Sequence, residues 1–276
     1  MKNKTIIVLA VLALVVAASF LWTSMPLRNM GGHGRMHSWM HGDPALLTGS
    51  PADPSESWTL AKGGQIYDKW WAATGANVPS VTHPSYPVSG KQTGPDTWRC
   101  KECHGWDYKG KDGRYGNGSH ATGIVGIRGA AARDVNAIIK LLRDPTHRYT
   151  PDMISEKSLS LVAAFVSRGQ HDTDSLIESE SGEIKAGTGS SENQSEQGRG
   201  IFQTTCAVCH GFDGRRLNFG TRTEPSFVGS EAQANPWEVL HKIRNGHPGA
   251  EMISLRALSL SDAAAVLAYA RALPAK

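Results

Sequence analysis

The sequence predicts a helical protein of two repeated units, which a linker joins and an apolar segment precedes. Three observations support this prediction. The order of motifs in residues 57–171 returns in residues 196–276. Each unit closes with a short apolar stretch that is a helix candidate. The 30 Gly and 14 Pro residues among 276 favour short elements and loops over long sheets.

Residues 1–22 are predicted to be a signal-anchor or a signal peptide. Lys2 and Lys4 precede an apolar run over residues 6–22, which has no polar face. This run is long for a signal peptide and slightly short for a spanning helix. Small residues at 16–18 offer a cleavage site, but the run continues beyond them, which favours an uncleaved transmembrane helix. Both alternatives place the rest of the chain on the periplasmic side of the inner membrane, either anchored or soluble after cleavage.

Residues 23–56 are predicted to be a tether, because they are rich in Met, His, Gly and Pro and show no helical or strand period. Thioether and imidazole groups together suit copper, particularly Cu(I). The alternative is a juxtamembrane segment of chance composition, since a ligand cluster without thiolates is a weak signal. The candidate copper ligands are Met25, Met30, His33, Met36, His37, Met40 and His41.

Two further segments are predicted to lack a core. Residues 172–195 are dominated by Ser, Glu, Gly and Asp and contain no aromatic residue, so we expect a flexible linker. Residues 72–97 are an insert of the first unit without a counterpart in the second. Four prolines within this insert predict a loop.

Each unit contains a Cys-x-x-Cys-His motif, at residues 100–104 and 206–210, and the two motifs use all four cysteines. This spacing is typical of covalent haem c attachment, because two thiols can add to the vinyl groups of one porphyrin while the adjacent His ligates iron. A thioredoxin-like motif needs no following His and expects a βαβ frame. A zinc ribbon spaces its Cys pairs about 15–20 residues apart, whereas about a hundred residues separate these. We expect two covalently bound haem c groups, with attachment at Cys100, Cys103, Cys206 and Cys209 and iron ligation by His104 and His210.

Met153 and Met252 are the candidates for the sixth iron ligand. They are the only Met residues in the two units, and they follow His104 and His210 by 49 and 42 residues. Each begins a Met-Ile-Ser triplet shortly before the closing helix. A thioether ligand favours ferrous iron and raises the potential, as in electron-carrier cytochromes. The usual role of Met is to fill a core, but the matched positions of this pair argue for ligation.

Histidines compete with these methionines. His147 and His247 precede each Met, and His120 is a further option in the first unit. An isolated His near a ligand loop is more often a hydrogen-bonding or propionate-contacting residue than the ligand itself. Ligation by two histidines stays open for one unit, chiefly the first.

Glycine and aromatic residues predict where the first and last helices of each unit cross. A small residue admits an aromatic ring at such a crossing. We expect Gly64 to pair with Phe165, and Gly200 with Tyr269.

With these motifs the two units resemble class I cytochromes c, in a tandem arrangement like that of other exported dihaem cytochromes. The resemblance covers about 200 residues. It implies small all-α domains wrapped on a haem, and the attachment and ligand residues named above. The segment 225–229 resembles the family loop whose proline carbonyl orients the proximal imidazole. The matching segment 122–126 lacks that proline, so another carbonyl must act in the first unit.

The resemblance implies transfer of single electrons between redox protein partners, as a free carrier or as a subunit of a respiratory complex, and no catalytic residue. The net charge of +4 is too small for a nucleic-acid partner and suits acidic protein partners. The alternative is a catalytic dihaem oxidoreductase. A thiosulfate dehydrogenase-like enzyme would need a fifth cysteine as a distal ligand, and a peroxidase-like one would need a vacant iron position with acid–base groups. The insert at 72–97 departs from the family pattern, and the sequence leaves open whether it covers a haem edge or docks a partner.

Overall fold

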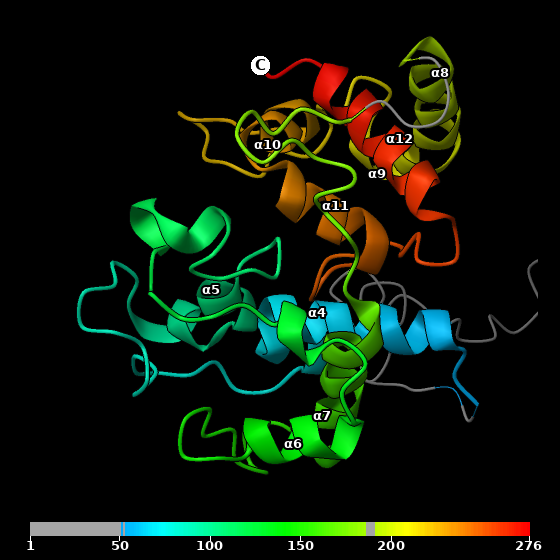
Figure 1. The fold of residues 1–276 in the computed structure, drawn as a ribbon. Helices are drawn as coiled ribbons and strands as arrows, with labels where there is room; N and C mark the ends of the chain where they lie inside the picture. The colour runs from blue at the N-terminus through cyan, green and yellow to red at the C-terminus, as the bar shows by residue number, and fades with distance from the viewer. Residues whose placement is uncertain (1–50, 52, 186–190) are drawn as a thin grey trace, which may run out of the picture. The chain divides into compact units, whose positions relative to one another are not determined.

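The computed structural model describes residue 51, residues 53–185 and residues 191–276 (Figure 1). The predicted N-terminal anchor at 1–22 and the candidate copper ligands of the tether lie outside the described residues. Among the described residues, no helix combines the length and the hydrophobicity that crossing a membrane requires. This part of the chain is helical, and its only β-structure is two isolated bridges. The expected all-α class is therefore confirmed for the described residues.

The first half is built around a long helix, α4, which crosses the closing helix α7. Ser55 caps α4 by accepting a hydrogen bond from the Trp58 backbone N–H at 3.2 Å. Ser155, the serine of the first Met-Ile-Ser triplet, caps α7 in the same way. The elements are α4 (Glu56–Thr74), η1 (Gly94–Trp98), α5 (Cys100–His104), η2 (Arg114–Gly116), η3 (Gly118–His120), η4 (Arg128–Ala130), α6 (Val135–Leu142), α7 (Glu156–Ala164) and η5 (Phe165–Gly169).

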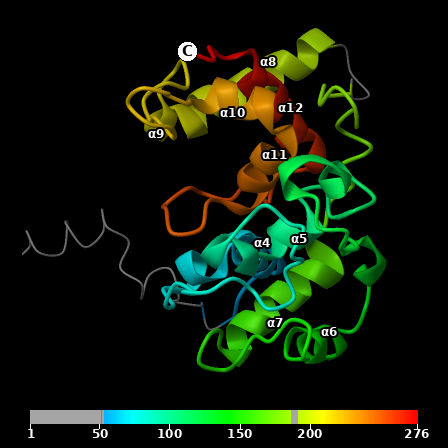
Figure 2. The same cartoon turned by 90° about the vertical axis from the view of Figure 1, so that its left-hand side faces the viewer.

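The second half repeats this plan with a crossing of α8 and α12 (Figure 2). Ser259 caps α12, five residues after the serine of the second Met-Ile-Ser triplet. The elements are α8 (Ser191–Ile201), η6 (Phe202–Cys206), α9 (Ala207–His210), α10 (Val228–Ala234), α11 (Pro236–Asn245) and α12 (Leu260–Ala272).

The crossings use different glycines from those predicted. A Cβ on Gly63 would overlap the Leu161 carbonyl and lie 2.6 Å from the Cβ of Phe165. A Cβ on Gly198 would overlap the Ala265 carbonyl and lie 3.1 Å from the Cβ of Tyr269. The aromatic partners were predicted correctly, and the glycine register was wrong.

The two mispredicted glycines lie elsewhere. A Cβ on Gly64 would overlap the Asn245 side chain of α11, and a Cβ on Gly200 would meet nothing within 4 Å. Gly63 and Gly198 hold the same place in the repeat, four residues before Tyr67 and Phe202. A single register of the repeat therefore accounts for both crossings.

The prediction of a flexible linker does not hold for residues 172–185. Ile177 is fully buried in the second core, and it forms an isolated bridge with Ile184. Lys185 closes this turn by donating to the Asp174 carbonyl at 2.7 Å. The average composition of the segment is polar, but a few apolar side chains are enough to pack it. Residues 186–190 lie outside the described residues.

The two halves share a buried interface formed by α4 and α11, which lie side by side (Figures 1 and 2). Gln65 donates to the Asn245 carbonyl at 2.9 Å, and His241 donates to the Gly64 carbonyl at 2.9 Å. Lys242 forms an ion pair with the fully buried Asp68. Helices far apart in the sequence thus hold the halves together, so the halves are not two independent domains joined only by a linker.

Candidate haem sites

Each Cys-x-x-Cys-His motif forms a helical turn that ends at a glycine in the left-handed region. Gly105 and Gly211 follow the two histidines, and both have φ of 80°. Only glycine adopts this conformation at no steric cost. All four cysteines are free thiols, because no disulfide links them. Burial raises the pKa of Cys100 to about 11 and that of Cys206 to about 11, so both side chains are neutral thiols at pH 7.

His104 of the first motif is held in one tautomer. Its Nδ1–H donates to the Val125 carbonyl at 2.7 Å. The Nε2 lone pair is therefore free to ligate a metal. At many metal sites the ligating histidine is fixed in the same way, by a hydrogen bond that its other ring nitrogen donates. Burial lowers the pKa of His104 to about 4, so the ring is neutral. Val125 lies in the segment 122–126, which lacks the proline of the family loop. The Val125 carbonyl is the other carbonyl that was expected to orient the imidazole of the first motif.

Residues 144–149, which we name the His147 loop, bring His147 to His104. The ring centres of the two histidines lie 6.3 Å apart with an interplanar angle of 27°. Asp144 Oδ1 accepts hydrogen bonds from the backbone N–H groups of Thr146 at 2.8 Å and His147 at 2.9 Å. The same oxygen lies 3.3 Å from His147 Nδ1. Arg148 has φ of 58°, an unfavourable conformation for a residue other than glycine.

The insert at 72–97 packs on the His147 loop. His83 Nε2 donates to the His147 carbonyl at 2.9 Å, and its Nδ1 accepts from the Ser85 backbone N–H at 3.0 Å. Ser85 donates in turn to the Thr146 carbonyl at 2.6 Å. The centre of the His83 ring lies 4.2 Å from that of Trp98, which lies two residues before the first motif. The insert therefore packs beside the first motif, and its role at a haem edge or toward a partner stays a prediction.

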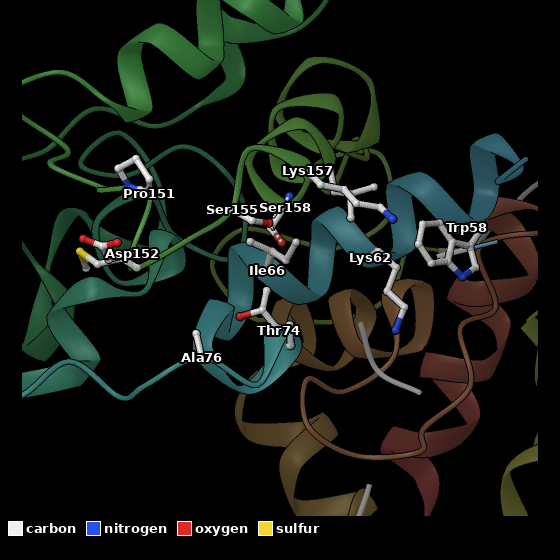
Figure 3. A pocket seen from close by; sticks show the side chains of 13 residues that line it. Trp58, Lys62, Ile66, Thr74, Ala76, Pro151, Asp152, Ser155, Lys157 and Ser158 are labelled. Carbon is white, nitrogen blue, oxygen red and sulfur yellow. Dashed lines mark hydrogen bonds between the residues drawn. The ribbon is translucent and has the colours of Figure 1, made fainter. Parts of the chain in front are cut away.

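Met153, the predicted sixth ligand, is half-buried against the first core. It lines a cavity of about 420 Å³ between α4 and α7. Figure 3 shows Trp58, Lys62 and Lys157 at one end of this cavity and Asp152 at the other. Among the described residues that line it, none belongs to the first Cys-x-x-Cys-His motif.

His120 is engaged in a charged cluster. Its Nδ1 donates to Glu102 Oε1 at 2.7 Å, and its ring stacks on Tyr115 with centres 4.8 Å apart. Glu102 is 1% exposed and also accepts from Lys101 at 2.9 Å. His120 thus donates a hydrogen bond to a buried carboxylate that is also paired with Lys101, which explains its position without iron ligation.

His210 of the second motif differs from His104. Its Nδ1 is buried and has no hydrogen-bond partner among the described residues. The prediction that the Pro225 carbonyl orients this ring is therefore wrong for this structure. The loop closes on itself instead, because the Phe219 N–H donates to the Ser226 carbonyl at 2.8 Å and Asn218 accepts from the Ser226 N–H at 2.9 Å.

The surroundings of the second motif fit a large apolar cofactor. Within the described residues, six of the eleven exposed large apolar side chains lie in sequence around this motif and the Met252 loop. Exposed apolar side chains that lie together mark a binding site. A porphyrin has apolar faces that such side chains can cover. These residues are Val208, Phe212, Leu217, Phe219, Ile253 and Leu258.

Two arginines that the sequence analysis missed hold the methionine loops. Arg143, at the end of α6, donates to the carbonyls of Tyr149 at 2.7 Å and Ile154 at 3.0 Å. Arg244, in the last turn of α11, donates to the Leu258 carbonyl at 2.5 Å. The signal was present in the repeat, because an arginine precedes Met153 by 10 residues and Met252 by 8.

A second missed feature is a buried chain of three rings between the halves. The Tyr108 hydroxyl donates to His241 Nδ1 at 3.0 Å, since the other nitrogen of His241 donates to a carbonyl. His171 Nε2 lies 3.2 Å from the same hydroxyl. Burial lowers the pKa of His241 to about 4 and that of His171 well below its usual value. No motif in the sequence signals this cluster, because its members are far apart in the chain.

The described residues thus form a helical protein with two Cys-x-x-Cys-His turns, and one comparison with known proteins bears on the second turn. The model of a family described as "Cytochrome C oxidase, cbb3-type, subunit III" matches residues 193–269. The match includes the second Cys-x-x-Cys-His motif and Met252. It supports a c-type cytochrome that binds haem c covalently and transfers electrons. No curated protein and no solved structure shows a significant match to the chain.

Proposed function

We propose that the chain is a dihaem c-type cytochrome that passes single electrons between protein partners on the periplasmic side of a membrane. The observation that carries this proposal is the pair of equivalent Cys-x-x-Cys-His turns, each of which ends at a glycine of positive φ directly after its histidine. The family match supports the second site, and the repeat extends the argument to the first.

The chain's own residues have defined tasks in this proposal. Cys206 and Cys209 would hold the second haem, with His210 and Met252 on its iron. Cys100, Cys103 and His104 would hold the first. When bound, the haem supplies the reversible one-electron couple of its iron. The protein orients His104 through Val125, covers the first motif with the insert, and holds both methionine loops through arginine.

The partner of this proposal is a larger membrane assembly. The matching family is described as a subunit of an oxidase, which favours a permanent complex over a free carrier. The anchor proposed for residues 1–22 would fit such a complex. Co-purification of the chain with other membrane subunits in mild detergent supports the complex, whereas recovery as a lone soluble protein favours the carrier.

The haem-to-chain ratio of the purified protein tests the proposal. We expect two haems that resist extraction by acid and organic solvent, and two one-electron steps in a reductive titration. The double variants Cys100→Ala/Cys103→Ala and Cys206→Ala/Cys209→Ala should each retain one haem. A colourless protein, or one haem in the unmodified chain, contradicts the proposal. Binding of one carbon monoxide per chain to the reduced, unmodified protein would favour the peroxidase-like alternative.

A further inference from the structure

We propose that His147, and not Met153, is the sixth ligand of the iron at the first motif. This inference rests on the proposed attachment of haem at Cys100 and Cys103. It concerns a residue that neither the repeat nor the family match assigns.

The distance between the ring centres of His104 and His147 suits one iron between them. A metal–imidazole bond is about 2.0 Å long, and the ring centre lies about 1.1 Å beyond the nitrogen. Two imidazoles on opposite sides of one metal therefore have centres about 6.2 Å apart. The observed separation is 6.3 Å.

The hydrogen bonds leave the same nitrogen free on both rings. His104 uses Nδ1 to donate to the Val125 carbonyl, and the Nδ1 of His147 lies 3.3 Å from Asp144 Oδ1. Each Nε2 is free of hydrogen bonds among the described residues. Histidines that ligate a metal through Nε2 typically engage Nδ1 with a carbonyl or a carboxylate in this way.

The His147 loop is held in place at a cost to the fold. Asp144 accepts hydrogen bonds from two backbone N–H groups of the loop. His83 and Ser85 of the insert donate hydrogen bonds to two carbonyls of the loop. Arg148, the next residue, adopts the left-handed conformation. Local strain of this kind persists where the surroundings fix a conformation that function requires. The insert has no counterpart in the second half, so this way of holding the histidine loop is found only at the first site.

The second half provides an internal comparison. Its loop between arginine and methionine is two residues shorter, and it has no counterpart of the insert that packs on the His147 loop. No ring contact between His247 and His210 occurs among the described residues. Met153, in turn, lines the cavity between α4 and α7, and no residue of the first motif lines that cavity among the described residues. We therefore expect two histidine ligands at the first site, and a histidine and a methionine at the second.

This difference in ligands sets a direction for electrons. Methionine raises the potential of a haem relative to a second histidine. The first haem should therefore have the lower potential, and the second the higher. Electrons would enter at the first half and leave from the second.

The absorption band that a thioether ligand gives ferric haem in the red tests the ligand set. We expect this band at the intensity of one haem per chain with two bound haems. Met252→Ala should abolish it, and Met153→Ala should leave it unchanged. His147→Ala should retain both haems and bind one equivalent of carbon monoxide when reduced, whereas the control His247→Ala should bind none.

The inference is overturned if the unmodified protein shows the band at the intensity of two haems, or if Met153→Ala removes part of it. These readouts decide the matter even if His147→Ala does not fold. A haem-to-chain ratio of one overturns the proposed function as well, and the two failures are thereby distinguished. Reductive titration should give the lower midpoint to the haem that survives in Cys206→Ala/Cys209→Ala.

Discussion

At the residue scale, some side chains are hydrogen-bonded to proposed iron ligands without being ligands themselves. Asp144 is one example, since its carboxylate accepts three hydrogen bonds in the His147 loop. The bond from the His147 backbone N–H, followed by others, lowers the pKa of Asp144, so the carboxylate is charged at neutral pH. A charged acceptor makes an imidazole a better donor to ferric iron.

Asp144→Asn should therefore raise the midpoint potential of the first haem. We expect a shift of some tens of mV, where 59 mV corresponds to a tenfold change in the one-electron equilibrium. Spectroscopic redox titration measures this shift. Asp152→Asn is the matched control, because Asp152 lines the cavity between α4 and α7. An unchanged potential in Asp144→Asn would contradict the role of this carboxylate.

Tyr108 is a second residue with a local task. Tyr108→Phe removes the hydroxyl that lies between His241 and His171, and both ring nitrogens then lose their partner. Leaving buried polar groups unpaired costs about 1–3 kcal/mol. We expect a loss of that size in the free energy of unfolding by urea. Tyr115→Phe is the control, since its hydroxyl makes no hydrogen bond among the described residues, and an equal loss in both variants would refute the prediction.

At the element scale, the crossing of the first and last helix is the unit that the repeat preserves. Gly198→Ala should destabilise the second half, because its Cβ would overlap a backbone carbonyl of α12. Overpacking of this kind costs about 1–3 kcal/mol. Gly200→Ala, two residues away on the same helix, should stabilise the protein by about 0.5–1 kcal/mol, because nothing lies within 4 Å of its Cβ. Thermal unfolding of the two variants should shift in opposite directions, and a common shift would argue against this crossing.

The same crossings show what a sequence can predict. The repeat located both haem-motif turns, both methionine loops and the aromatic residue of each crossing. The glycine register was missed because two glycines occur within three residues in each copy, and helical periodicity alone does not choose between them. The packed turn at 172–185 was missed because average composition hides a single buried Ile177. The meeting of His147 with His104 depends on the insert, whose Pro-rich sequence carries no period from which to infer contacts.

At the scale of the whole molecule, stability should depend on pH through the interface of α4 and α11. His241 is buried there, and its pKa falls to about 4 mainly because of burial. Its surroundings are Tyr108, His171, Asp68 and two further cations, Lys242 and Arg256. The unfolded state binds a proton near the ordinary pKa of about 6.5, and the folded state binds it only near 4.

The contribution of His241 to stability is therefore complete above pH 6.5 and is lost as the pH falls from there to about 4. We expect the free energy of unfolding to be lower at pH 5 than at pH 7 by about 1–3 kcal/mol. Urea unfolding at the two pH values measures this difference, and His241→Gln should reduce it. Equal stability of the unmodified protein at both pH values would contradict the prediction.

Asp68 adds a second pH-dependent contribution to the stability of the same interface, at lower pH than His241. Burial opposes its ionisation, but Lys242 and Arg99 outweigh burial and lower its pKa to about 2. A lone carboxylate in this position would be costly, whereas one shared by cations from both halves ties them together.

The packing of α4 on α11 also has a kinetic consequence for a carrier with two cofactors. Because the contact is buried, the two halves would not move relative to each other, and the distance between the two irons would stay fixed. The hop from one iron to the other would then be insensitive to solvent viscosity. Only the encounters at either end, with the donor and with the acceptor, would slow in a thicker medium.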